Sequence, residues 1–346
     1  MALDLETLNQ LIETVRRFVD ERLIPLEHQV AEDDKVPDDL IAEMKDMGLF
    51  GLSIPEEYGG LGLTMEEEAL VCLELGRTSP AFRSAFGTNV GIGSQGIVID
   101  GTEAQKREYL PKIASGEYVT SFALTEPDAG TDAGSLKTTA VRDGDHYVLN
   151  GSKAFISGGS AADVYVCMVR TGEDGPKGIS CIVVEKDSPG LSFGKLEKKL
   201  GWNSQPTAAV IFEDCRVPVE NLVGAEGDGF AIAMKGLDGG RLNIGACSVG
   251  GARACLDASR DYMKDRKQFG QPLADFQALQ FRLADMATEL ESARLMIHRA
   301  AWMLDNNAHG TTVAAAMAKR VATDTGFDVV NQALQLHGGY GYLKEF

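Results

Sequence analysis

The segment FALTEPDAGTDAGS, residues 122–135, gathers residue types that could bind a planar polar ligand. Thr125 and Thr131 each carry a hydroxyl, and Gly130 allows backbone conformations that other residues avoid. Pro127 favours a turn between them. Such a loop can direct backbone N–H groups and hydroxyls toward a hydrogen-bonding ring or a carbonyl group. An ordinary polar loop is the alternative, and the residue types alone favour it.

Two other segments combine aromatic side chains with polar or charged ones. The segment KAFIS (153–157) contains an aromatic residue, Phe155, close to a serine hydroxyl. In DRKQFGQPLADFQALQ (265–280), the planar guanidinium of Arg266 suits a phosphate, and Phe269 offers an apolar wall. Packing within a sheet is the alternative for Phe155, and a solvated basic patch is the alternative for the second segment.

The segment GLDGGRLNIGA (236–246) adds a pair of opposite charges, Asp238 and Arg241. Their spacing places both on one face of a helix. The pair could contact a polar ligand. It could also be an ordinary ion pair on a helix surface, which contributes little stability.

Helical regions on both sides of a strand-rich region must position these residues. Residues 1–119 show apolar side chains at helical spacing, with a boundary or kink at Pro25. From residue 226 onward the helical pattern returns in long stretches typical of a bundle. We predict a mainly α fold with a β insertion, divided into an N-terminal all-α domain (1–119), a middle β domain (120–225) and a C-terminal helical bundle domain (226–346).

The middle region contains short β-branched and apolar runs of strand length. Asp143-Gly144 and Asn150-Gly151 are both strong signals for tight turns between such runs. The region is therefore predicted to form a compact antiparallel sheet.

Composition and charge exclude several classes of function. The net charge of −18, from 51 acidic and 33 basic residues, disfavours nucleic acid as a partner. No apolar run approaches the roughly 20 residues that span a bilayer, so we expect no membrane role. The spacing of the six cysteines and five histidines predicts no metal site and a reducing compartment. The acidic start is unlike a targeting peptide, which favours the bacterial cytoplasm, or the mitochondrial matrix for a processed eukaryotic form.

The segment 122–135 resembles the first signature of the acyl-CoA dehydrogenase family, and the resemblance extends over essentially the whole chain. In that family this loop lies along the isoalloxazine ring of FAD, and the segment matching 153–157 covers the ring. The segment matching 265–280 approaches the pyrophosphate of FAD in a neighbouring subunit. The segment matching 335–339 approaches the adenosine of FAD. The implied FAD contacts are Phe122, Leu124, Thr125, Gly130, Thr131, Phe155, Ile156, Ser157, Arg266, Phe269, Gln277, Gln335, Leu336, His337, Gly338 and Gly339. The implied acyl-CoA contacts are Thr131, Asp238 and Arg241.

The resemblance implies FAD-dependent α,β-dehydrogenation of a short or branched-chain acyl-CoA thioester, with electrons passed to electron-transfer flavoprotein. It also implies a homo-oligomer, a dimer of dimers. From about residue 143 the chain is most similar to the isobutyryl-CoA dehydrogenase branch of the family, whereas residues 79–97 resemble relatives of broader or longer chain preference. Three alternatives stay open: a medium- or long-chain acyl-CoA dehydrogenase, a non-catalytic protein of this fold that binds FAD or acyl-CoA, and an acyl-CoA oxidase.

The resemblance also bears on the general base. Some relatives carry the catalytic glutamate at the position of Gly240, which has no side chain. In others the glutamate follows the second family signature, within which this chain ends. We therefore expect the base after Phe346, an incomplete C-terminal bundle, and poor turnover by the chain as given. Within the chain, Glu126, Asp132 and Asp238 are alternative bases, but a structural role is favoured for each.

Overall fold

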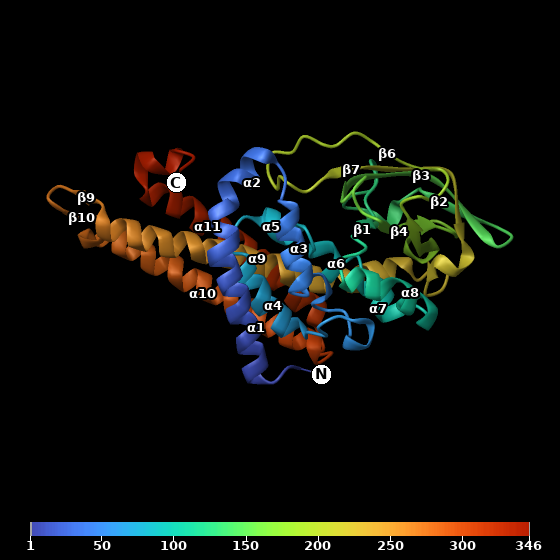
Figure 1. Ribbon diagram of the computed structural model, residues 1–346, viewed down its shortest axis with the longest axis horizontal. Helices are drawn as coiled ribbons and strands as arrows, with labels where there is room; N and C mark the ends of the chain where they lie inside the picture. Colours follow the sequence, from blue (N-terminus) through green and yellow to red (C-terminus); the bar gives the residue numbers. More distant parts are fainter. Residues whose placement is uncertain (1, 346) are drawn as a thin grey trace. The chain divides into compact units, whose positions relative to one another are not determined.

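The computed structural model describes residues 2–345, and their contacts group the chain into two compact units. Figure 1 labels most of the elements of both. Unit 1 comprises His28–Leu63 and Arg83–Leu237, and unit 2 comprises Ala2–Glu27, Thr64–Phe82 and Asp238–Phe346. The order of helices, then a sheet, then helices confirms a mainly α fold with a β insertion. The predicted boundaries near residues 119 and 225 stay predictions.

The helices follow the predicted pattern along the chain. They are α1 (Leu5–Phe18), α2 (Glu27–Asp33), α3 (Asp38–Asp46), α4 (Met65–Leu75), α5 (Pro80–Ser84), α6 (Gly87–Val90), α7 (Gln95–Asp100), α8 (Glu103–Ala114), α9 (Gly229–Asp265), α10 (Gln277–Asp305) and α11 (Thr311–Leu336). Pro25 lies in a short 3₁₀ turn, Ile24–Leu26, between α1 and α2, in agreement with the boundary predicted there. Thr64 begins α4 with a capping box: its side chain accepts from Glu67 N, and the Glu67 carboxylate accepts from Thr64 N.

Unit 1 is built around an eight-stranded sheet. Its strands are β1 (Thr120–Ala123), β2 (Thr139–Asp143), β3 (His146–Ser157), β4 (Val164–Arg170), β5 (Ile179–Glu185), β6 (Leu191–Phe193), β7 (Thr207–Pro218) and β8 (Leu222–Val223). The strand order is β6-β7-β3-β2-β4-β5-β8, and β1 pairs with β4. Most pairs are antiparallel as predicted, but β1 runs parallel to β4, and β2 meets β4 in parallel at one residue pair. β1 can be parallel because it is followed by the loop 124–135 and not by a hairpin.

The two glycine turn signals in the middle region have different outcomes. Asp143-Gly144 forms the predicted hairpin turn between β2 and β3, and Gly144 has φ +64°. The prediction of a turn at Asn150-Gly151 is wrong, because β3 continues through both residues with a shift in its pairing to β7. The Asn150 side chain instead accepts a hydrogen bond from Asp214 N at 2.9 Å, which joins β3 to β7.

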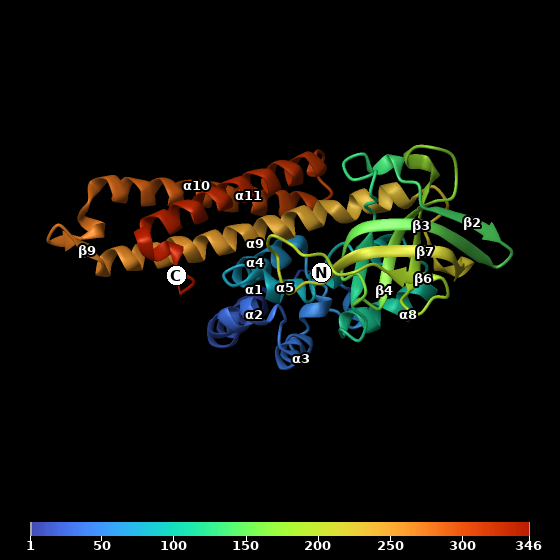
Figure 2. The ribbon, with the colours of Figure 1, turned by 90° about the horizontal axis from the view of Figure 1, so that it is seen from above.

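Unit 2 contains the long helices. Buried residues of α9, α10 and α11 share one apolar core with α4, including Leu242, Leu290, Ile297 and Val329. In Figure 2, α10 and α11 run alongside α9 over much of its length. Two short strands, β9 (Lys267–Gln268) and β10 (Gln271–Pro272), form a hairpin between α9 and α10.

Residues 2–345 can be examined for membrane-spanning helices, for clusters of metal ligands and for the burial of cysteines. No helix in this range is both long and apolar enough to cross a bilayer. No group of three or more potential metal ligands is found among the same residues. Cys167 on β4 and Cys181 on β5 are fully buried, and burial raises the pKa of the Cys167 thiol to about 12. Both therefore serve as small apolar core residues.

Candidate active site

The loop that follows β1 holds most of the predicted ligand contacts of unit 1. Phe122 and Leu124 are partly buried and pack against the core beside the sheet. Gly130 and Thr131 are exposed, and Thr125 is half-buried. The loop is joined to the sheet by its backbone, because Ala154 N on β3 donates to the Thr125 carbonyl at 2.9 Å. Residues 122–131 therefore combine a fixed base with an exposed tip.

Phe155 has an unusual backbone conformation and an exposed ring. It lies where the pairing of β3 with β7 shifts, between Lys153, which faces Val210, and Ile156, which faces Ala208. This bulge places Phe155 at φ +57°, a region that costs a non-glycine residue about 1–3 kcal/mol and is found mainly at functional sites. The side chain is 69% exposed. The strain is therefore not offset by burial of the ring within unit 1.

The two residues after Phe155, Ile156 and Ser157, differ in burial and in the groups that they expose. Ile156 is 2% exposed and belongs to the core of the sheet, so only its backbone can reach a ligand. Ser157 is half-buried, and its carbonyl accepts a hydrogen bond from the Ser121 hydroxyl at 2.6 Å. That bond joins the end of β3 to β1. The structure thus brings the 122–131 loop and the Phe155 segment together.

A buried ion pair lies beneath this loop. Lys153 Nζ donates to Glu126 Oε1 at 2.7 Å, and the two side chains are 0% and 7% exposed. Burial raises the pKa of Glu126, but the charge of Lys153 and hydrogen bonds from Lys153, Thr138 and Lys137 outweigh it, so the net pKa is lowered. A carboxylate held this way is a poor proton acceptor, which argues against Glu126 as the general base. Sequence reasoning missed Lys153.

Asp238 and Arg241 lie on α9 and form an ion pair in unit 2. Asp238 is 8% exposed, and its second carboxylate oxygen accepts a hydrogen bond from the Thr312 hydroxyl at 2.7 Å. The pair is therefore more than a solvated surface contact. Arg241 is partly exposed and keeps donors that can reach a ligand. Thr312, on α11, was not predicted from the sequence.

The β9–β10 hairpin presents Phe269 to solvent. Phe269 has φ +54° and is 93% exposed, and its ring meets that of Phe276 edge-on at 6.2 Å. Arg266 and Gln277, at the two ends of the hairpin, are also exposed. As with Phe155, a strained backbone position carries an aromatic ring that unit 2 does not bury.

The end of α11 lies next to the end of α9. His337 stacks on Tyr262 at 4.4 Å between ring centroids, and the Arg266 guanidinium lies 5.5 Å from the Tyr340 ring centroid. Unit 2 thus brings Arg266 and the segment 335–339 together. Within that segment, Gln335 and Gly339 are exposed, Leu336 is buried and Gly338 adopts φ +61°.

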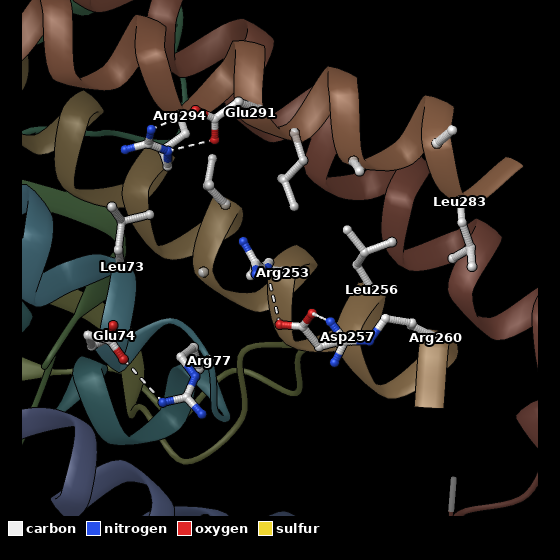
Figure 3. A pocket seen from close by; sticks show the side chains of 15 residues that line it. Leu73, Glu74, Arg77, Arg253, Leu256, Asp257, Arg260, Leu283, Glu291 and Arg294 are labelled. Carbon is white, nitrogen blue, oxygen red and sulfur yellow. Dashed lines mark hydrogen bonds and ion pairs between the residues drawn. The ribbon is translucent and has the colours of Figure 1, made fainter. Parts of the chain in front are cut away.

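A groove of about 480 Å³ lies elsewhere in unit 2, between α4, α9 and α10 (Figure 3). Leucine side chains such as Leu256 and Leu283 line it, together with several arginines. Several of these arginines pair with carboxylates, for example Arg294 with Glu291 at 2.6 Å. Among the described residues, none of the predicted site residues lines this groove.

Comparison with known proteins assigns the chain to a family. Three family models match it in succession: the acyl-CoA dehydrogenase N-terminal domain over residues 6–117, the middle domain over 121–215 and the C-terminal domain over 227–346. The chain belongs to the acyl-CoA dehydrogenase family. It is an oxidoreductase that acts on CH–CH donors, and this family uses FAD.

Individual members of the acyl-CoA dehydrogenase family are similar over nearly the whole chain. The mitochondrial isobutyryl-CoA dehydrogenase of Dictyostelium discoideum is 53% identical over 333 residues, which cover 95% of this chain and 79% of that protein. The CarC subunit of the caffeyl-CoA reductase–Etf complex of Acetobacterium woodii is 39% identical, covering 98% and 90%. The butyryl-CoA dehydrogenase structure from Megasphaera elsdenii superposes with a TM-score of 0.95 at 37% identity, covering 100% and 92%.

The residues present fit the cofactor of the acyl-CoA dehydrogenase family. Phe155 offers an exposed aromatic face to a flat ring, and the loop beside it offers the Thr131 hydroxyl. Arg266 offers an exposed guanidinium of a kind suited to a phosphate, and Phe269 offers an exposed apolar ring. Both aromatic residues adopt positive φ, Phe155 at the bulge of β3 and Phe269 together with Gly270 in the two-residue turn between β9 and β10. Both positions leave an aromatic ring exposed.

Proposed function

We propose that this protein binds FAD and catalyses α,β-dehydrogenation of a short or branched-chain acyl-CoA to the 2-enoyl-CoA. The observation that carries the proposal is Phe155, a strained and exposed aromatic residue on a bulge beside the 122–135 loop. Similarity to isobutyryl-CoA and butyryl-CoA dehydrogenases supports the substrate class. Their names also support a role in the breakdown of branched-chain amino acids or fatty acids.

In this proposal the two units contribute different contacts to FAD. The loop backbone at Thr125 and Gly130, with the hydroxyls of Thr131 and Ser157, hydrogen-bonds the polar edge of the ring system. Phe155 covers its face. Arg266, Phe269 and Gln277 of a second copy of the chain contact the pyrophosphate. The adenosine contacts are Gln335, Leu336, His337, Gly338 and Gly339. Bound FAD supplies the hydride acceptor that no amino-acid side chain can provide.

Asp238 and Arg241 of unit 2 are proposed contacts of the acyl-CoA thioester. The exposed hydroxyl of Thr131 in unit 1 is proposed as a further acyl-CoA contact. The α-proton of a thioester is weakly acidic, so a carboxylate base and a polarised carbonyl are both needed. Gly240 offers no base, and the carboxylates of Glu126 and Asp238 are engaged by Lys153 and by Arg241. The predicted glutamate base lies outside the described residues.

Electron-transfer flavoprotein is the proposed electron acceptor, and a homo-oligomer is the proposed assembly. The similarity to the CarC subunit of a reductase–Etf complex supports the acceptor. A site completed by Arg266 and Phe269 of a second copy needs at least a dimer. Reduced enzyme should therefore transfer electrons to electron-transfer flavoprotein faster than to O₂, whereas fast reaction with O₂ would favour the oxidase alternative.

The test is anaerobic reduction of bound FAD by isobutyryl-CoA, butyryl-CoA and octanoyl-CoA, each added separately. The reduction is monitored by visible absorbance for several hours, so that slow turnover is detected. The proposal predicts loss of the oxidised flavin band with isobutyryl-CoA or butyryl-CoA before octanoyl-CoA. Preference for octanoyl-CoA would favour the medium-chain alternative. Binding of FAD without reduction by any of the three would favour the non-catalytic alternative.

A further inference from the structure

The ion pair between Glu126 and Lys153 sits under the loop that is proposed to bind FAD. Lys153 is on β3, two residues before Phe155, and is fully buried. Glu126 follows Thr125 in the loop and is 7% exposed. Two buried charges in contact lose their hydration, so the pair gains little or no net stability over an apolar pair of similar volume. The ion pair can therefore affect the conformation of the loop as well as the stability of the fold.

The carboxylate of Glu126 connects three segments. One oxygen accepts from Lys153 Nζ at 2.7 Å and from Thr138 N at 2.9 Å, and the other accepts from Lys137 N at 2.6 Å. These partners lie on β3 and in the chain that enters β2. The Glu126 side chain therefore fixes both ends of the loop, because Glu126 lies near its start and Lys137 lies at its end.

The lysine makes a second contact to the loop backbone. Lys153 Nζ also lies 3.3 Å from the Leu124 carbonyl, and the next residue, Ala154, donates its N–H to the Thr125 carbonyl at 2.9 Å. The carbonyl groups of two successive loop residues are thus oriented by two successive residues of β3. Once these carbonyls are fixed, the planes of the adjoining peptide groups are fixed as well.

The loop needs such a constraint because of its own composition. It contains Gly130, and its tip is in solvent, as Gly130 and Thr131 are exposed. Glycine-containing exposed segments sample many backbone conformations. If a ligand binds only one of these conformations, its apparent affinity is reduced in proportion to the fraction of time that this conformation is populated.

We propose that Glu126 and Lys153 are positioning residues that hold the 124–131 backbone in the conformation that accepts the flat ring of FAD. This inference rests on the proposed FAD binding but concerns how the loop is prepared for it. Neither side chain touches the ligand in this account. Both act through the carbonyls of Leu124 and Thr125 and through the closure of the loop at Lys137.

The test compares a Glu126→Met/Lys153→Met double variant with wild type. Methionine at both positions removes the charges together, so no lone charge is left buried. The matched control is Asp143→Met/Arg216→Met, which removes an exposed ion pair of 3.0 Å in the same unit. For each protein we would measure FAD affinity, the absorbance bands of bound FAD, the thermal midpoint without FAD, and hydrogen–deuterium exchange of residues 124–138.

We expect the Met/Met variant at 126 and 153 to bind FAD about tenfold or more weakly, since its loop spends roughly a tenth of its time in the competent conformation. Its flavin bands should shift toward those of free FAD, and exchange of residues 124–138 should rise with or without FAD. The control should match wild type. Unchanged affinity, bands and exchange in the folded double variant would overturn the inference.

Two further outcomes separate this inference from the proposed function. If wild type fails to bind FAD, the proposed function is wrong, while exchange of residues 124–138 still decides whether the pair orders the loop. If the double variant does not fold, Glu126→Gln is measured in the same way, because it retains one acceptor oxygen and the side-chain volume. Wild-type affinity and loop exchange in Glu126→Gln would overturn the inference.

Discussion

Replacing Lys153 alone should destabilise the protein strongly, and the effect should depend on pH. Lys153→Met keeps an apolar chain of similar length but leaves the Glu126 carboxylate, 7% exposed, without its counter-charge. Breaking a buried ion pair costs about 3–5 kcal/mol. Because Glu126 still accepts from Lys137 N and Thr138 N, we expect the lower end, about 3 kcal/mol near neutral pH. For a unit of this size that corresponds to roughly 6–12 °C in thermal midpoint.

The pH dependence of stability gives the sharper test, because the contribution of Glu126 to this dependence has opposite signs in wild type and in Lys153→Met. In wild type, Lys153 helps to hold the pKa of Glu126 below its ordinary value of 4.5, so the carboxylate adds stability above that value, and this stability is lost as pH falls through the lowered pKa. In the variant, burial without the lysine should raise the pKa of Glu126. Glu126 then binds a proton more tightly in the folded state, so the variant loses stability as pH rises through the raised pKa.

Thermal unfolding followed by circular dichroism at about pH 5 and about pH 8 measures this directly. The midpoint difference between wild type and Lys153→Met should be larger at the higher pH. Arg216→Met, which breaks the exposed pair with Asp143, should cost only about 0–1 kcal/mol at both. An equal loss for the two variants, or a Lys153→Met deficit that does not change with pH, would refute the assignment of a buried, interacting pair.

Other expectations follow from the site residues. Phe155→Ala should weaken FAD binding roughly three- to tenfold, measured by titration calorimetry, with little change in thermal midpoint because the ring is exposed. Arg266→Gln should weaken FAD binding roughly tenfold or more, and wild-type affinity would exclude a charged contact to the pyrophosphate. Thr312→Val should raise the KM for acyl-CoA roughly two- to tenfold in steady-state assays, since Asp238 loses one partner; an unchanged KM would separate Asp238 from substrate binding.

Helices were the most predictable part of the fold. Residues 1–119 and the region from 226 onward carry apolar side chains at helical spacing, and helices such as α4 and α10 form there. Such periodicity reflects burial along a single element, so it can be read without knowing the partners. The Asp143-Gly144 turn was equally accessible, because its backbone requirement is local.

What could not be predicted depends on strand register. With strict alternation, Lys153 and Phe155 would lie on the same face of β3, but the bulge leaves Lys153 fully buried and Phe155 69% exposed. Asn150-Gly151 failed as a turn signal because pairing to β7, more than fifty residues later, keeps β3 extended. The buried lysine and the hydrogen bond of Thr312 to Asp238 depend on tertiary contacts that local patterns do not encode.

The central claim is that the chain forms a specific site for FAD from the 122–135 loop and Phe155. Titration of purified protein with FAD, followed by the shift of the flavin absorbance bands and by quenching of flavin fluorescence, tests it most directly. The account predicts saturable binding of one FAD per chain, weakened in Phe155→Ala. Bands and fluorescence that stay those of free FAD at saturating protein would contradict it.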